Sequence, residues 1–508
     1  MPPKKRAATR GQIRGSTLLL AGRFLSKGVN FASQVMIVRY LAKSDYGAFA
    51  YALSIVALGE TVVTFGLNRA ITRFVPIYHE RHDYDKLFGT IIMAASTTLS
   101  LGIAMILFLY GLRGVIAQSF IGDQQALTLL LILVFLAPVQ AIDKLLNGMF
   151  AVFSRPRAIF FRKYVMGPGF RLSVVLLLIL GHSDVHYLAS GYLAVGALAV
   201  AIYTVLLFHT LREQNLFQHF NLQTINIPAR EVLAFTIPLL TTDLVYTVMN
   251  SLDAVILEHF HGTVDVAALR AVQPTATLNR LVFASFGLLF TTLAARMFAR
   301  DDREGINNLY WQNAVWVAVA SFPIFAMTFS LARPLTVLLY GIRYEQSATI
   351  LALLSFGYYF HAALGFNGTT LMVFGKVRYI VVLNVVAAVA NLGVNLLLIP
   401  RYGALGAAIG TCGTLVAHNI LKQAGLALGT GIRLFDRRYL KVYASITSAA
   451  LGLLLVQGVT SAPFYVSFVL AIVTSLLVLR LNRESLDIEH VIPELLRFPL
   501  ARYLLGDG

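Results

Sequence analysis

The 508-residue sequence has few charged residues and almost no cysteine. Asp, Glu, Lys and Arg make up 13% of the chain and hydrophobic residues 57%, whereas soluble globular proteins carry about 25% charged residues. This composition excludes a soluble protein and predicts a polytopic membrane protein. Cys412 is the only cysteine, so no intramolecular disulfide can form. Its apolar surroundings predict an inert thiol.

Acidic residues are scarce, with 24 Asp and Glu against 41 Lys and Arg and a net charge of +17. Such an excess in a soluble protein would suggest nucleic acid, but here the basic residues concentrate in alternate loops. That distribution predicts cytoplasmic termini and leaves no need for a nucleic-acid partner. The basic N-terminus leads into an apolar run of spanning length, which predicts a cytoplasmic anchor rather than a cleaved signal. The outward loops are too short for an external catalytic domain.

Hydropathy predicts about fourteen membrane-spanning helices, because each crossing of roughly 30 Å of hydrocarbon needs about 20 apolar residues. Pro138, Gly167-Pro168-Gly169, Pro238 and Pro274 interrupt four of them, which suits either an internal cavity with moving helices or static kinks. The expected cores are 16–38, 46–68, 87–110, 126–148, 158–180, 186–209, 232–257, 266–294, 308–330, 346–373, 378–399, 403–426, 438–457 and 463–480.

The chain also repeats itself at an offset of about 220 residues. Asn147-Gly148 aligns with Asn367-Gly368, and Asp45 aligns with Asp265, in one register over six helices. An even number of helices gives both halves the same orientation, so we expect two six-helix bundles related by a pseudo-twofold along the membrane normal. The predicted divisions are a basic N-terminus (1–15), a first bundle (16–211), a cytoplasmic linker (212–230), a second bundle (231–428), two extra helices (429–480) and a cytoplasmic tail (481–508).

Charged residues inside the expected helices are candidates for function, because each costs about 2.5–3.5 kcal/mol to insert. Arg23 lies roughly 10 Å and Glu60 roughly 12 Å from the cytoplasmic helix ends, so the two can pair. The repeat aligns Arg23 with Asp243 and Glu60 with Arg280, which predicts a second pair with exchanged signs. These groups therefore serve either as structural ion pairs or as ligand and ion-coupling residues.

Other polar residues are candidates for binding an anionic sugar-bearing ligand. Lys27 aligns with Thr247 and has no acidic counterpart, so an anion ligand is the favoured interpretation over snorkelling or an unseen carboxylate. Arg171 is a further cationic candidate. Asn30 and Asn250 are equivalent by the repeat and suit either sugar hydroxyls or contacts between helices.

Carboxylates are the candidates for coupling transport to an ion gradient. Glu60, Asp243 and Asp253 are the predicted coupling residues, and the adjacent Asp143 and Lys144 are additional polar candidates. The sequence shows no nucleotide-binding loop, metal-ligand cluster or catalytic triad, so we expect no cofactor and no metal.

The run RYLAKSDYGAFAYALSIVALGETVVTFGLNRAITRFVP resembles the helix 1 to 2 signature of the bacterial oligosaccharide flippases. These form the polysaccharide transport branch of the multidrug/oligosaccharidyl-lipid/polysaccharide exporter superfamily, and the helix number, two halves and short loops fit as well. The resemblance implies that undecaprenyl-diphosphate-linked glycans cross the bacterial inner membrane by alternating access. It also implies partners among membrane lipids and other polysaccharide assembly proteins, and a helix 1 cation for the ligand, matched here by Arg23 and Lys27.

Two other functions stay open. A drug or small-molecule cation antiporter of the same superfamily shares the fold but favours a cavity dominated by carboxylates, whereas Arg23, Lys27, Arg171 and Arg280 favour an anionic ligand. Glu60, Asp143, Asp243 and Asp253 make the cavity less purely cationic than the family resemblance implies. A membrane glycan polymerase or ligase, which would be an enzyme, typically needs the long external loop that this chain lacks.

Overall fold

The computed structural model describes residues 3–119, 121–153, 159–460 and 462–487. These residues form helices joined by turns and short connections, and none of them is in a β-strand. The loop containing Arg155 and Arg157 and residues 488–508 of the predicted tail lie outside this range. The chain divides into two compact units, residues 1–267 (unit 1) and 268–508 (unit 2).

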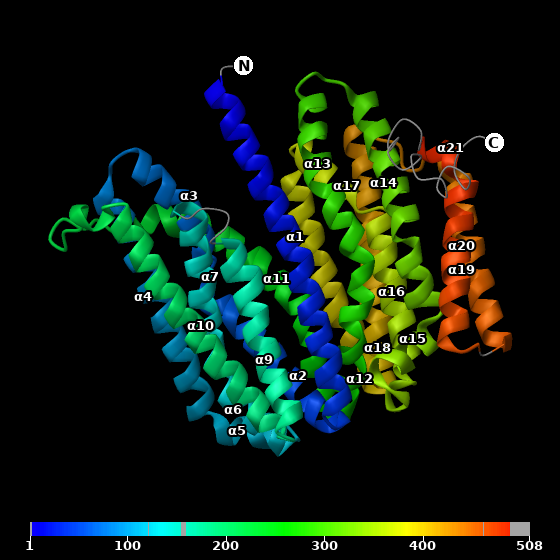
Figure 1. Ribbon diagram of the computed structural model, residues 1–508, viewed down its shortest axis with the longest axis horizontal. Helices are drawn as coiled ribbons and strands as arrows, with labels where there is room; N and C mark the ends of the chain where they lie inside the picture. Colours follow the sequence, from blue (N-terminus) through cyan, green and yellow to red (C-terminus); the bar gives the residue numbers. More distant parts are fainter. Residues whose placement is uncertain (1–2, 120, 154–158, 461, 488–508) are drawn as a thin grey trace. The chain divides into compact units, whose positions relative to one another are not determined.

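Unit 1 contains long helices with short connections (Figure 1). Its elements are α1 (Pro3–Tyr40), α2 (Lys43–Thr64), α3 (Leu67–Glu80), α4 (Tyr84–Gly111), α5 (Arg113–Ser119), α6 (Gln124–Leu133), α7 (Leu136–Phe153), the π-helical turn η1 (Phe161–Met166), α9 (Gly167–Leu180), α10 (Val185–Glu213), η2 (Leu216–His219) and α11 (Ala229–His261).

Unit 2 follows the start of α12 (Thr263–Ala276) and has the same helical character. Its further elements are η3 (Thr277–Arg280), α13 (Leu281–Phe298), α14 (Arg303–Phe325), η4 (Ala326–Ser330), α15 (Ala332–Tyr340), η5 (Ile342–Tyr344), α16 (Ser347–Ala363), α17 (Phe366–Val373), α18 (Val377–Thr430), η6 (Arg437–Tyr439), α19 (Leu440–Thr460), α20 (Phe464–Leu481) and α21 (Arg483–Leu486).

Eleven helices in the described residues are long and apolar enough to cross a membrane, or twelve if the bent pair Thr263–Gly287 and Phe290–Phe298 counts as one span. α18 counts once among them, although its 54 residues rise about 80 Å, enough for two crossings. Gly403 breaks it with φ 55° and ψ −134°. α1 is long enough but carries Arg23 and Lys27 and is not among the eleven. Each of the fourteen expected cores coincides with one helix or a run of consecutive helices.

The packing of unit 1 includes α11, which contacts α2 and α3. The predicted bundle boundaries, 16–211 and 231–428, describe the internal repeat rather than this packing and stay a prediction. The core of unit 1 gathers buried side chains from α3, α4, α7 and α10, among them Leu67, Leu87 and Tyr203. Burial of these apolar residues stabilises the scaffold that positions the polar groups described next.

The break between α2 and α3 brings polar residues close to α11. Phe65 (φ 50°) and Gly66 (φ 69°) both adopt the left-handed conformation, which ends α2 and lets α3 leave at a new angle. A Cβ at Gly66 would lie 3.3 Å from the carbonyl oxygen of Thr236 on α11. Glycine therefore suits both the backbone conformation and the close approach at this position.

Candidate functional site

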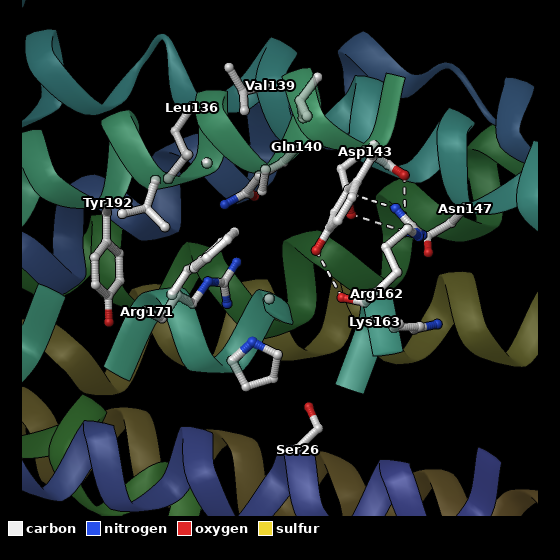
Figure 2. Close-up of a pocket in the computed structure, with 18 of the residues that line it drawn as sticks. Ser26, Leu136, Val139, Gln140, Asp143, Asn147, Arg162, Lys163, Arg171 and Tyr192 are labelled. Carbon is white, nitrogen blue, oxygen red and sulfur yellow. Dashed lines mark hydrogen bonds and ion pairs between the residues drawn. The ribbon is translucent and has the colours of Figure 1, made fainter. Parts of the chain in front are cut away.

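Unit 1 contains a cavity of about 280 Å³ between α1, α7, η1, α9 and α10. Figure 2 shows side chains from α7 on one side of it and those of η1 and α9 on the other. The lining residues are Ser26, Asn30, Leu136, Val139, Gln140, Asp143, Asn147, Arg162, Lys163, Gly167, Pro168, Phe170, Arg171, Tyr192, Val195, Gly196, Ala199, Val200 and Tyr203.

The charged groups of this lining have a positive balance. Arg162, Lys163 and Arg171 are cations and Asp143 is the one carboxylate among the lining residues, so the formal net charge is +2. Because the walls are otherwise apolar or neutral, charges there are screened less than in water. The cavity therefore favours an anionic ligand group over a cationic one.

Asp143 is held by two side chains. Its carboxylate accepts a hydrogen bond from Arg162 Nη1 at 3.0 Å and another from Asn147 Nδ2 at 3.0 Å. The Arg162 guanidinium is buried, with its Cζ 4.4 Å from the ring centroid of Tyr203 and 4.9 Å from that of Phe150. The Tyr203 hydroxyl donates to the carbonyl oxygen of Arg162. Arg162 and Asp143 thus neutralise each other and tie η1 to α7.

The π-helical turn η1 sets the direction of the two other cations. Lys163 and Arg171 are eight residues apart, which in a regular α-helix places them about 80° apart around the axis. A π-turn accommodates about one extra residue, so the spacing behaves as seven α-helical positions and the angle falls to about 20°. Lys163 and Arg171 therefore lie on one face, two turns apart, and both line the cavity.

These two cations have no fixed counterion in the part of the chain that the structure describes. The described ion pairs there include Asp143 with Arg162 and Glu60 with Lys144, but none that involves Lys163 or Arg171. In Figure 2 the Arg171 side chain extends from α9 towards the α7 side chains. Both cations remain able to bind an incoming anion.

α1 contributes the predicted Asn30, together with Ser26, to the cavity. The helix packs on α9 and η1, and at Gly22 a Cβ would lie 2.6 Å from Tyr164 and 2.7 Å from Phe160. Arg23 and Lys27 are exposed in unit 1 and are not among the residues that line this cavity. The cavity brings together the predicted site residues Asn30 and Arg171 and the additional candidate Asp143.

Glu60 has a partner other than the expected Arg23. Its carboxylate lies 2.8 Å from Lys144 Nζ on α7, because α2 packs against α7 whereas α1 packs against α9. Asp143 and Lys144 are adjacent and therefore point in different directions around α7, one to η1 and the other to α2. The similar expected depths of Arg23 and Glu60 did not indicate how each helix is rotated about its axis, and so did not indicate which neighbouring helix each side chain faces.

Asp243 also has a partner other than the expected one. Its carboxylate is 2.5 Å from Arg69 Nη2, whereas the repeat suggested Arg280, which belongs to unit 2. Arg69 directly follows the expected core 46–68 and lies in the first turn of α3. A hydrogen bond between Thr61 and Thr247, 2.9 Å long, further connects α2 with α11.

The two equivalent asparagines share one local geometry. Asn30 Nδ2 donates to the carbonyl oxygen of Ser26 at 2.8 Å, and Asn250 Nδ2 donates to that of Tyr246 at 2.6 Å. Each amide is thereby bonded to its own helix four residues back. Asn250 does not line the cavity of unit 1, so only Asn30 is placed to meet a ligand there.

Asp253, the third candidate for ion coupling, is buried on α11 and accepts a hydrogen bond from the backbone of Ala254. No group of three or more His, Cys, Asp or Glu side chains that could hold a metal ion occurs among the described residues. The predictions of no metal and no cofactor remain predictions.

Sequence reasoning missed Arg162 and Lys163. Both fall near the start of an expected helix, where a cation is normally attributed to the membrane surface. The available signal was the neighbouring Gly167-Pro168-Gly169, which marks an irregular helix, and π-turns in such helices are frequent at functional sites.

Two curated proteins are similar to this chain in sequence. It is 21% identical over 399 residues to the capsular polysaccharide biosynthesis protein CapF of Staphylococcus aureus, which covers 78% of this chain and 94% of that protein. It is 27% identical over 139 residues to stage V sporulation protein B of Bacillus subtilis (strain 168), a match spanning only 27% of either chain.

A solved structure shows the same fold. The structure of lipid II flippase MurJ in an inward closed conformation has a TM-score of 0.72 with 14% sequence identity, covering 93% of this chain and all of that one. The predicted all-α, two-bundle membrane fold is confirmed by this similarity, and the protein is a multi-pass membrane protein.

Family models give the assignment. The MatE model matches residues 238–397, which agrees with the predicted multidrug/oligosaccharidyl-lipid/polysaccharide exporter superfamily, whose members are transporters rather than enzymes. The model described as polysaccharide biosynthesis protein matches residues 13–290, more than half of the chain. The chain therefore belongs to the polysaccharide biosynthesis protein family.

Proposed function

We propose that this protein is a flippase that moves an undecaprenyl-diphosphate-linked oligosaccharide, a polysaccharide or O-antigen repeat unit, across a bacterial inner membrane by alternating access. The observation that carries the proposal is the pair Lys163 and Arg171, which line one cavity on one helix face with no ion pair in the described chain. A diphosphate supplies the negative charge that this pair lacks.

The chemistry of a lipid-linked glycan supports this reading. Its polar head cannot enter hydrocarbon and its polyprenyl tail cannot leave it, so a carrier must offer the head a polar cavity inside the membrane. Asn30, Gln140 and Tyr192 add hydrogen-bonding groups to the cationic lining, which suits sugar hydroxyls. The names of CapF and of the lipid II flippase also refer to glycan chemistry.

A drug or small-molecule cation antiporter is the second candidate, supported by the MatE match to residues 238–397. Such a transporter needs an available carboxylate for its cation. In unit 1, Glu60 and Asp243 are each in an ion pair and Asp143 is paired with Arg162. The net positive cavity therefore favours the flippase.

Ion coupling and membrane orientation remain part of the proposal. The pairs Glu60–Lys144 and Asp243–Arg69 favour a structural role for these two carboxylates. Asp253, which is buried on α11, stays a predicted coupling residue. The concentration of basic residues in alternate loops supports cytoplasmic termini.

The test uses the full chain in proteoliposomes with a fluorescent undecaprenyl-diphosphate-linked trisaccharide. We expect Arg171→Ala and Lys163→Ala each to lower the initial transport rate by about 10- to 100-fold, the loss of one hydrogen bond to a charged group. Arg113→Ala, which removes an exposed cation on α5, is the matched control. The same preparation is assayed with ethidium as a cationic substrate.

Transport that persists in Arg171→Ala and Lys163→Ala would remove the basis of the proposal, and ethidium transport without glycan movement would favour the antiporter. Arg23→Ala and Lys27→Ala are measured alongside. A loss of glycan transport in either variant would support the predicted role of the α1 cations, and normal rates in both would exclude it.

A further inference from the structure

The membrane-spanning part of unit 2 contains several cations but few carboxylates. The segments 266–300, 305–344, 346–435 and 437–483 have no Asp or Glu at all, and Glu304 lies in the first turn of α14, at the end of its span. The spans of unit 1, by contrast, contain Glu60, Asp143, Asp243, Asp253 and Glu258. Within these segments of unit 2, a cation therefore has no carboxylate to neutralise it.

Two such cations, Arg280 and Lys422, are brought together with His361. Arg280 ends η3, which packs on α16; α16 carries His361 and packs in turn on α18, which carries Lys422. The charge of Arg280 acts on both groups. Phe283, one turn after Arg280, has its ring centroid 5.8 Å from that of His361. The cluster is thus assembled from three elements far apart in sequence.

Asparagines fix the geometry of this cluster. His361 Nδ1 lies 3.2 Å from Asn419 Oδ1 and 3.0 Å from Asn419 Nδ2, and Asn367 Nδ2 donates to the carbonyl oxygen of Asn419 at 3.2 Å. Lys422 follows Asn419 by three residues, so the two side chains are neighbours on the surface of α18. A Cβ at Gly368 would be 3.8 Å from Lys422 Nζ, so α17 approaches this ammonium group at a position that has no side chain.

Neither Arg280 nor Lys422 is fully exposed, and neither has an ion pair or hydrogen bond in the described residues. Two like charges held within interaction range at a place with restricted water repel each other. A fold tolerates such a pair when a ligand of opposite charge completes it, and intramembrane cations without partners are expected at ligand pathways.

We propose that Arg280, Lys422 and His361 form an oxyanion-binding subsite within unit 2 that takes a phosphate or carboxylate group of the transported ligand. This inference rests on the proposed function only for the identity of the ligand. The planar guanidinium of Arg280 can hold two oxygens at once, Lys422 adds a point charge, and His361 can add one donor. Unit 2 would thus contribute a binding group of its own for the ligand.

The decisive variant is Lys422→Glu, because it exchanges a repulsive pair for an attractive one. In the purified full chain in phosphatidylcholine nanodiscs, we expect Lys422→Glu to weaken undecaprenyl diphosphate binding at least about 100-fold, since a ligand contact is lost and a repulsion gained. We also expect its ligand-free unfolding temperature to rise, because the introduced carboxylate can pair with Arg280. Lys422→Arg should keep binding within about threefold, well below the effect of one charged hydrogen bond.

Lys376→Glu is the matched control, since this exposed lysine precedes α18 in the same unit, and it should change neither quantity. All measurements are repeated in an Arg171→Ala background, which separates the contribution of the unit 1 cavity to binding from that of unit 2. Inorganic pyrophosphate is titrated as a second probe. If Lys422→Glu weakens the binding of pyrophosphate and of the lipid in parallel, the subsite recognises the oxyanion itself. If it weakens only the binding of the lipid, the subsite recognises a membrane-held anion.

Unchanged binding of both probes in Lys422→Glu would overturn the subsite. A lower ligand-free unfolding temperature would also overturn it, because Lys422 would then be a structural group rather than an unsatisfied cation. Loss of transport in Arg171→Ala with normal binding in Lys422→Glu would leave the proposed function standing and exclude the subsite alone.

Discussion

Two ion pairs on α7 predict responses of different size to similar substitutions. Asp143→Asn removes the negative partner of Arg162, whose side chain is only 3% exposed, and Glu60→Gln removes that of Lys144, which is 44% exposed. Both substitutions preserve side-chain shape. The two variants therefore compare a cation that is left buried with one that water can solvate.

The expected magnitudes differ clearly. An uncompensated buried charge costs about 3–5 kcal/mol, and the rings of Phe150 and Tyr203 offset roughly 1 kcal/mol each, which leaves about 2 kcal/mol for Asp143→Asn. The cost of Glu60→Gln should stay within about 1 kcal/mol, as for an exposed pair. These costs correspond to amide hydrogen exchange that is about 30-fold faster in Asp143→Asn and at most about fivefold faster in Glu60→Gln.

Hydrogen–deuterium exchange of the full chain in nanodiscs measures the cost of each of the two substitutions. Peptides within 136–153 and 159–180 report the local opening of α7 and α9, and peptides from α19 serve as an internal reference. Faster exchange in Glu60→Gln than in Asp143→Asn would refute the reasoning, because it would show that exposure of the remaining partner does not control the cost.

Two further predictions concern segments outside the cavity. Asp436, between α18 and η6, accepts hydrogen bonds from Arg438 Nε at 3.0 and 3.1 Å, which hold the pKa of its carboxyl below its usual value near 3.8. The pair therefore stabilises the fold at neutral pH and loses this contribution as the pH falls below about 4. We expect the acid unfolding of unit 2 to shift to higher pH in Arg438→Gln, with Arg437→Gln as control. Identical unfolding profiles in the two variants would contradict this prediction. Gly403→Ala should destabilise the protein by about 1–3 kcal/mol, because only glycine adopts φ 55° and ψ −134° at the kink of α18 without strain. Thermal unfolding measures this effect, with Gly413→Ala in the same helix as control. Equal unfolding temperatures of the two variants would exclude a strained position.

The sequence was sufficient to locate the apolar helices. Hydropathy located the cores because a span must be continuously apolar, and the polar residues of α1 were evident from the same pattern. It did not determine how each helix turns about its axis. Arg23 and Glu60 have matching depths, yet Glu60 meets Lys144 because α2 faces α7.

Local irregularity limited the prediction of the site. Arg171 and Asn30 were identified because they lie within regular helices, where a polar residue is conspicuous. Lys163 and Arg162 were not, since their place in the cavity depends on a π-turn that hydropathy cannot detect. The start of α3 at Leu67 was not predicted, because the left-handed pair Phe65 and Gly66 that precedes it leaves no trace in the apolar pattern.

The π-turn η1 also makes the ligand site easy to change in evolution. One extra residue between Phe161 and Met166 keeps Lys163 and Arg171 on a common face. Substitutions that favour a regular α-helix there, at unchanged chain length, would place the two cations about 80° apart. Both cations would keep their identity. A change at residues that touch no ligand would then be enough to alter how a descendant of this protein presents its cations.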